Sequence, residues 1–190
     1  MDVKRKTEAG LISELRKSEA QLRQSVKAGN VGLWDWDLRT DRVFFSSEWK
    51  SQIGYEDHEV SDDLSEWKSR VHPDDIQRAM AAVKAFIANE IPAYAVEFRF
   101  RHKDGSYRWI LAQASILLDE QGQPERMLGS HVDITERKRV EEALRASEER
   151  YRSVIEDQTE IISRFRPDGT FLFVNDVYCR LLGKPRVSRR

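Results

Sequence analysis

The sequence predicts an α+β fold, in which a five-stranded antiparallel sheet carries helices on one face and is flanked by N- and C-terminal linker helices. Segments with strand and helix patterns follow one another in the order two strands, helices, three strands. The chain of 190 residues is 39% hydrophobic and 34% charged, a balance that suits a small core with long solvated helices. The sequence also contains an internal repeat, whose unit is about one small domain long.

The repeat relates the segment around Ser18 to the segment around Ser147, 129 residues further along the chain. The alignment runs without a gap to Gly54 and Gly183, and apolar residues match apolar residues throughout. Matched pairs are Leu11 and Val140, Leu15 and Leu144, Leu22 and Tyr151, Leu33 and Ile162, and Trp49 and Tyr178. We interpret this pattern as the duplication of a unit about one small domain long.

Residues 1–24 and 136–152 have the periodicity of amphipathic linker helices. Each has an apolar seam at spacing 4-3-4, which is too narrow to cover a globular core but fits the a and d positions of a two-stranded coiled coil. We therefore expect a parallel homodimer; the alternative is a helix that lies back on its own domain. The seam residues are Leu11, Leu15, Leu22, Val140, Leu144 and Tyr151.

The first half of the complete domain, which we expect over residues 25–135, begins with a hairpin. Residues 31–37 alternate in polarity, turn residues follow, and an apolar strand resumes at 43–45. A short helix is predicted at 47–53 and irregular helical turns at 61–71.

The second half of the domain begins with a longer helix over residues 73–89, with Met80, Val83 and Ile87 on its apolar face. Pro73 suits the first helical turn, where its missing N–H is no loss. Three strands then follow, separated by turns rich in Gly, Asp and Pro. They are expected at 94–101, 107–118 and 127–134.

Four sequence motifs, in this order, resemble those of the PAS family, in the subgroup that ends in an Asp-Ile-Thr motif. They are Trp-Asp-Trp-Asp at 34–37, Val-His-Pro-Asp-Asp at 71–75, the hairpin at 98–109, and Asp-Ile-Thr-Glu-Arg-Lys at 133–138. The resemblance covers residues 20 to 135 and implies the PAS fold. Residues 153–183 match only the opening of such a domain, as a truncated second copy, and residues 184–190 form a basic tail.

The resemblance implies a sensory or regulatory module of a larger signal-transduction protein, such as a sensor histidine kinase or a cyclic-di-nucleotide enzyme. The alternative is a ligand-free scaffold that only pairs and spaces helices. No phosphate-cradling glycine loop or other catalytic constellation is recognisable, so we expect no enzymatic activity here and an output domain elsewhere. The output domain of the parent protein and a small-molecule ligand are the expected partners.

The cofactor remains unknown from sequence. PAS light sensors of the cysteine–flavin type use a cysteine within the complete domain, and the one cysteine here, Cys179, lies outside it, which excludes that type. Haem would need an axial histidine. His72 at the start of the long helix is expected to be structural, and His102 and His131 to be surface or sheet residues.

Aromatic side chains of the domain either fill its core or line a pocket for a flat apolar molecule. If a pocket exists, Trp34, Trp49 and Phe98 are the first candidates to line it. Because small domains need large side chains to bury enough area, an aromatic-rich core is also expected of a domain that binds no ligand.

The junction at Asp133, Ile134 and Thr135 is the expected signal-transmission site, because there a central strand runs directly into the linker helix. By resemblance, this motif transmits signals in the family. Asp133 is expected to pair with Arg101 or Arg108, and Asp133 or Thr135 to cap the new helix by accepting from its free N–H groups.

The net charge of -1 provides no field to recruit nucleic acid or an anionic membrane. No apolar run approaches the roughly 20 residues that span a bilayer, and one cysteine suits a reducing compartment. We expect a cytoplasmic chain with no nucleic-acid partner and no membrane contact.

Overall fold

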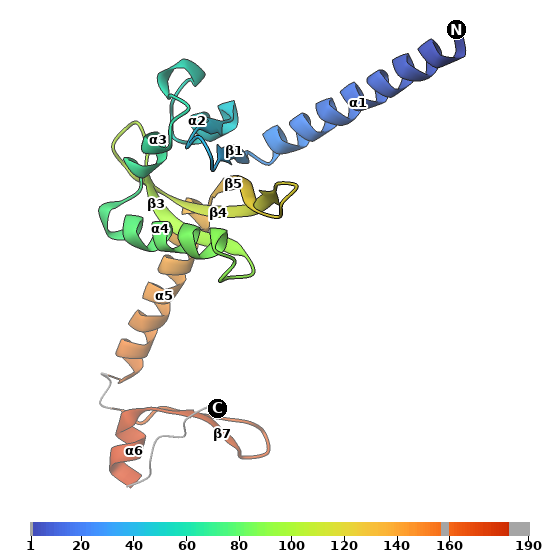
Figure 1. The fold of residues 1–190 in the computed structure, drawn as a ribbon. Helices are drawn as coiled ribbons and strands as arrows, with labels where there is room; N and C mark the ends of the chain where they lie inside the picture. Colours follow the sequence, from blue (N-terminus) through green and yellow to red (C-terminus); the bar gives the residue numbers. More distant parts are fainter. Residues whose placement is uncertain (1, 157–159, 183–190) are drawn as a thin grey trace. The chain divides into compact units, whose positions relative to one another are not determined.

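The computed structural model describes residues 2–156 and 160–182, with side chains from residue 10 onward except residues 155–159. The chain divides into two compact units, residues 1–136 and 137–190, which are described separately. Figure 1 shows the elements in chain order. The predicted basic tail at 184–190 lies outside the described residues.

The first unit contains a five-stranded antiparallel sheet with strand order β2-β1-β5-β4-β3. This order places β5 at the centre, hydrogen-bonded to β1 on one side and to β4 on the other. The strands are β1 (Gly32–Asp37), β2 (Val43–Phe45), β3 (Tyr94–Arg101), β4 (Tyr107–Leu118) and β5 (Pro124–Asp133). Strand β5 begins three residues before the predicted position because Pro124 already pairs with Leu118.

Four short or medium helical segments pack against one face of this sheet (Figure 1). They are α2 (Ser47–Gln52), the 3-10 helix η1 (Asp57–Glu59), α3 (Leu64–Lys68) and α4 (Pro73–Ile87). Helix α4 begins where the sequence predicts. His72 is its N-cap and accepts a hydrogen bond from the Asp74 amide through Nδ1 at 3.2 Å, and Pro73 occupies the first turn.

The core lies between the sheet and these helices. On β1 and β3 the even-numbered residues point inward, and on β5 the odd-numbered residues do. This alternation follows from the period of two in a strand. The largest fully buried side chains of this core are Trp49, Ile53, Phe98, Phe100, Ile110 and Met127. On the opposite face of the sheet Leu33, Phe44 and Leu117 remain exposed.

An ion pair ties α4 to β3. The Asp75 carboxylate accepts from the Arg99 backbone amide and from Arg99 Nε, both at 2.9 Å. These hydrogen bonds lower the pKa of Asp75 to about 2, and the same carboxylate raises the pKa of Arg99. The Arg99 guanidinium also lies 5.9 Å from the centre of the Trp109 ring. This pair therefore fixes α4 over the sheet.

The two linker helices are longer than predicted. Helix α1 covers Asp2–Ala28 and α5 covers Thr135–Glu156. Every described seam residue is exposed by 59% or more of its surface. These are Leu11, Leu15, Leu22, Val140, Leu144 and Tyr151. Their pairing across a dimer stays a prediction.

The second unit repeats the hydrogen-bonding plan of the first. It contains the hairpin β6 (Ser163–Phe165) and β7 (Phe171–Val174), followed by α6 (Asp176–Leu182). In the first unit, Ser46 Oγ accepts from the amides of Leu33 and Trp49. Asn175 Oδ1 accepts from the amides of Ile162 and Tyr178. Each residue of the second set lies 129 positions after its counterpart, so the repeat seen in the sequence has a structural basis.

Candidate functional site

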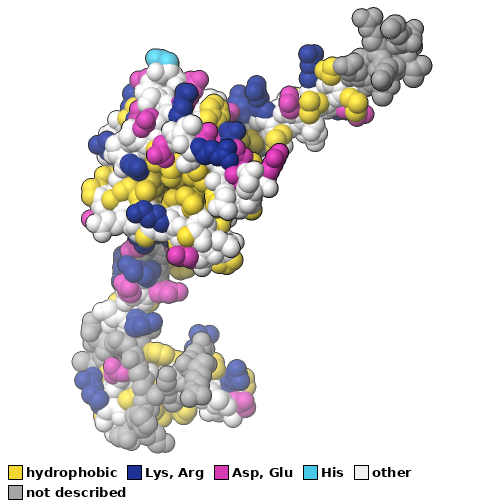
Figure 2. Space-filling view, viewed as in Figure 1, with side chains coloured by type: hydrophobic (Ala, Val, Ile, Leu, Met, Phe, Trp, Pro, Cys, Tyr) yellow, Lys and Arg dark blue, Asp and Glu magenta, His cyan; other side chains and the backbone are white. Residues whose placement is uncertain are grey.

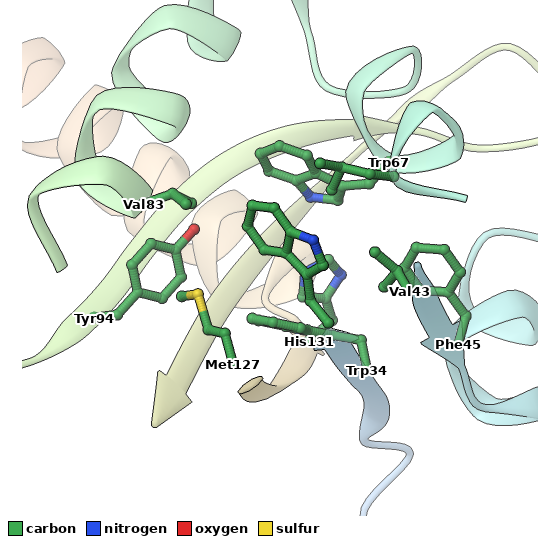
Figure 3. Close-up of a pocket in the computed structure, with 10 residues that line it drawn as sticks. Trp34, Val43, Phe45, Trp67, Val83, Tyr94, Met127 and His131 are labelled. Atoms are coloured by element: carbon green, nitrogen blue, oxygen red, sulfur yellow. The ribbon is translucent and has the colours of Figure 1, made fainter. Parts of the chain in front are cut away.

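A small cavity lies in the first unit between the sheet and its helical layer (Figure 3). Its volume is about 30 Å³. Eight of its ten lining residues are buried, and the two half-buried ones, Trp36 and Leu64, form its most accessible wall. The buried ones are Trp34, Val43, Phe45, Trp67, Val83, Tyr94, Met127 and His131. In Figure 2, hydrophobic side chains gather on the face of this unit between α3 and α4.

His131 on β5 is surrounded by aromatic rings. The centroids of Trp49, Phe98 and Phe100 lie between 5.5 and 5.9 Å from its ring, and that of Trp34 lies at 6.1 Å. Burial lowers the pKa of His131 to about 3, because the charged imidazolium would lose its hydration in this setting. His131 is therefore neutral at physiological pH.

Two indole N–H groups in this core have no hydrogen-bond partner within the described part of the chain. They belong to Trp34 and Trp49, and both are buried. An unpaired buried donor costs roughly 1–3 kcal/mol. Of these two residues, Trp34 is among those that line the cavity and Trp49 is not.

The three pocket residues proposed from sequence have different positions. Trp34 lines the cavity, whereas Trp49 and Phe98 pack behind it against His131. Whether any of them binds a ligand stays a prediction. Sequence reasoning missed His131 as a lining residue, although its odd-numbered position on a strand with buried Met127 indicates the inward face.

The backbone around Trp34 requires a glycine beside it. A Cβ on Gly129 would come within 2.2 Å of Trp34 Cζ2 and 2.4 Å of the Gln113 carbonyl oxygen. The Trp34 ring therefore lies directly against the β5 backbone, on the strand that also carries His131.

The other two histidines weighed as haem ligands have structural positions. His72 caps α4 and contacts the Tyr107 ring, with centroids 4.6 Å apart. His102 packs on Gly54, whose φ of +80° and close approach leave no room for a Cβ. Neither histidine lines the cavity.

The strand-to-helix junction is held by three hydrogen bonds. Ile134 N–H donates to the Trp109 carbonyl at 2.8 Å, and Thr135 Oγ1 accepts from the Trp109 amide at 2.9 Å. Asp133 Oδ1 accepts from the Thr135 amide at 2.8 Å and so satisfies the first free N–H of α5. Of the two proposed caps, Asp133 has this role, and Thr135 instead attaches the helix to β4.

The predicted pairing of Asp133 with an arginine is wrong. Arg101 donates to the Ser69 carbonyl, and the Arg108 guanidinium lies 3.8 Å from Asp104. Asp133 pairs with Ile110 on β4, so the turn residue Asp104 meets Arg108 instead, and Arg101 on β3 is separated from β5 by β4.

Strand β5 connects the cavity to the junction. His131 lies two residues before Asp133, and its carbonyl accepts from Gln52 Nε2 of α2 at 3.1 Å. A single residue, Ile134, separates the end of β5 from the start of α5. No loop separates β5 from α5. A displacement of His131 on β5 therefore acts on a strand that continues almost directly into the helix.

Known proteins match this chain along most of its length. A family model described as PAS fold matches residues 42–131. Sensor protein FixL of Bradyrhizobium diazoefficiens is 34% identical over 134 residues, covering 70% of this chain and 26% of that protein. The probable diguanylate cyclase DgcE of Escherichia coli is 30% identical over 183 residues, covering 90% of this chain and 16% of that protein.

A solved structure is also similar. The sensory box histidine kinase/response regulator from Burkholderia thailandensis is 39% identical with a TM-score of 0.61, covering 70% of this chain and 98% of that chain. Together with the fold, these relatives define the class as a sensory domain with a role in signal transduction, of the kind found in sensor histidine kinases and diguanylate cyclases. The chain belongs to the PAS family. It spans about a quarter or less of the two curated relatives' own length.

Proposed function

We propose that the first unit is a regulatory sensor that passes changes in its core through β5 into α5. The observation that carries this proposal is the direct connection of the central strand to the helix through Ile134 alone. Because Thr135 is also fastened to Trp109 on β4, a shift of β5 relative to β4 changes the direction of the helix rather than bending a loop.

The output of this sensor is proposed to be a dimeric linker. The exposed seams of α1 and α5 support it, since a narrow apolar stripe on a charged helix is buried most readily against a second copy. Within the described residues, no helix is long and apolar enough to cross a membrane.

The second unit is proposed to begin a further PAS domain. The shared hydrogen-bonding pattern of Ser46 and Asn175 supports this assignment. The domain boundaries proposed from the sequence, 25–135 for the complete domain and 153–183 for the truncated copy, are kept as part of this proposal. The kinase or cyclase activity of a parent protein would then belong to another part of that protein, as the names of the relatives suggest.

Light sensing through a cysteine–flavin adduct is not proposed. A relative 29% identical, from Brucella anthropi, is named a blue-light-activated histidine kinase. The single cysteine of this chain, Cys179, lies on α6 of the second unit and not in the complete domain.

A ligand-free dimerisation and spacer scaffold is the second candidate function. It is favoured by one observation, the small volume of the cavity, which leaves the core nearly filled by protein side chains. In a scaffold, the junction holds the helix at a fixed angle whatever happens in the cavity.

Distance measurements between two copies separate these functions. A spin label at position 146 on α5, in a Cys179→Ser background, reports the helix separation by double electron–electron resonance. For a sensor, His131→Phe in the cavity shifts the distance distribution, whereas Leu117→Ala on the exposed sheet face does not. Identical distance distributions in the unsubstituted chain, His131→Phe and Leu117→Ala would overturn the sensor proposal and support the scaffold.

A further inference from the structure

The side-chain amide of Gln52 lies between the end of α1 and the central strand of the sheet. Its Nε2 donates to the Asn30 carbonyl, and it donates to the His131 carbonyl at 3.1 Å. Asn30 lies two residues after the last residue of α1, and His131 lies on β5. A primary amide carries two N–H donors, so this one side chain on α2 joins both segments.

The Asn30 carbonyl belongs to the C-terminal cap of α1. The Val31 amide donates to the Val26 carbonyl at 3.1 Å. The Asn30 amide donates to the Lys27 carbonyl, also at 3.1 Å. Asn30 has a φ of +46°, the left-handed conformation that closes a helix in this way. A change in the last turn of α1 therefore moves the acceptor of Gln52.

Helix α2 holds Gln52 directly against the sheet, next to the end of α1 (Figure 1). A Cβ on Gly32 of β1 would come within 2.7 Å of Trp49 Cα and 2.9 Å of Gln52 Oε1, so no side chain fits between α2 and β1 here. Gln52 is 9% exposed, so water competes weakly for its two hydrogen bonds. The amide and its two carbonyl acceptors therefore move together.

This link is specific to the first unit. The counterpart of Gln52, 129 positions later, is Leu181, which has no amide and is 69% exposed. In the second unit, the segment before β6 is held by Asn175 instead, whose Nδ2 donates to the Glu160 carbonyl at 2.8 Å. Fastening this segment therefore does not require a donor at the position of Gln52, which indicates a role beyond building the hairpin and helix.

We propose that Gln52 is a positioning residue that couples the end of α1 to β5 and so makes α1 a second input to α5. From His131 the path follows β5 to Asp133, which accepts from the Thr135 amide at the start of α5. Coupling between two sites is reciprocal, so a shift of β5 also acts on α1. This inference rests on the proposed sensory function, because it adds an input to the same output.

A second route from α1 to β5 runs through the backbone. Val31 leads directly into β1, where Gly32 pairs with His131. A double-mutant cycle separates this route from the one through Gln52, because two changes on one route are not additive, whereas changes on independent routes are.

The cycle changes both ends of the hydrogen bond in the ¹⁵N-labelled full chain. Asn30→Ala disfavours the positive φ and so displaces the cap of α1, whereas Asn30→Gly keeps that φ and is the matched control. Gln52→Met keeps the length of the side chain but removes both donors. Gln113→Met makes the same replacement on the exposed face of β4 and is the second matched control.

Amide hydrogen exchange at the start of α5 is the readout. The rates at Ile134 and Thr135 are divided by the rate at Arg99, so that a general loss of stability cancels. In the chain with Gln52, Asn30→Ala should exchange about fivefold faster at these two amides than Asn30→Gly, the factor that one neutral hydrogen bond contributes. This ratio should fall below about twofold with Gln52→Met and stay at about fivefold with Gln113→Met.

Equal rates in Asn30→Ala and Asn30→Gly would overturn the proposal, and this comparison needs no change at Gln52, so it holds even if Gln52→Met does not fold. A fivefold ratio that persists in Gln52→Met would also overturn it and would place the coupling in β1. Either failure leaves the spin-label comparison of His131→Phe with Leu117→Ala unaffected. The link from α1 and the sensor function can therefore fail separately.

Discussion

Replacement of Thr135 by valine tests whether the start of α5 is fastened to the sheet. Valine keeps the shape of threonine but removes Oγ1, which accepts from the Trp109 amide at 2.9 Å. Thr135 is 8% exposed and Trp109, whose amide loses this acceptor, is half-buried. A partly buried N–H left unpaired costs roughly 1–3 kcal/mol. We therefore expect Thr135→Val to lower the free energy of unfolding by about 1–2 kcal/mol.

Urea unfolding followed by tryptophan fluorescence measures this loss. The midpoint should fall while the slope with denaturant stays constant, because the surface exposed on unfolding is unchanged. Thr135→Ser is the matched control: it keeps the hydroxyl and should recover most of the stability. If Thr135→Val and Thr135→Ser were equally stable, the hydrogen bond to Trp109 would not fasten the junction, and the reasoning would be refuted.

Three further predictions concern the core. The pKa of Asp75 is lowered to about 2 in the folded state, so its stabilisation, on the order of 2 kcal/mol, is present above about pH 4 and is lost as the pH falls toward 2. In Asp75→Asn, the free energy of unfolding should depend less on pH between about pH 4 and pH 2. An unchanged pH dependence in this range would contradict the role given to Asp75. The pKa of His131 is lowered from 6.5 to about 3, so the unfolded chain binds its proton first and stability falls as the pH drops from about 6.5 toward 3. His131→Phe should flatten the stability profile between pH 6.5 and 4, measured by thermal unfolding, whereas an unchanged profile would place the titration elsewhere. Gly129→Ala should destabilise the chain by about 1–3 kcal/mol in urea, because the new Cβ would overlap Trp34; Gly10→Ala, where nothing lies within 4 Å, should not. Equal stability of these two variants would show that the sheet relaxes around residue 129.

The fold was largely predictable because its local signals agree with one another. Alternation at 94–101 and turn residues after it fix the β3–β4 hairpin, and Pro73 with two aspartates fixes the start of α4. The start of β5 was missed because residues 124–126 carry no apolar alternation. Their pairing with β4 comes from the sheet and not from their own sequence.

The site was only partly predictable. The junction followed from the sequence because a strand pattern passes into a helix pattern without turn residues. The partner of Thr135 did not, since Trp109 lies 26 positions earlier and only the sheet register brings it close. For the same reason the arginine partners of Asp133 were predicted wrongly. His131 was overlooked because histidine is most often partly exposed, and its burial depends on four rings from other elements.

Hydrogen exchange at the junction tests the coupling of cavity and helix most directly. The amides of Trp109, Ile134 and Thr135 each donate to a junction acceptor, and their exchange rates can be measured one by one by NMR. In the cavity variant Trp34→Phe, these amides should exchange severalfold faster relative to the Arg99 amide, which is held by Asp75. Leu117→Ala on the exposed face should leave the ratio unchanged. A constant ratio in Trp34→Phe would contradict transmission through β5.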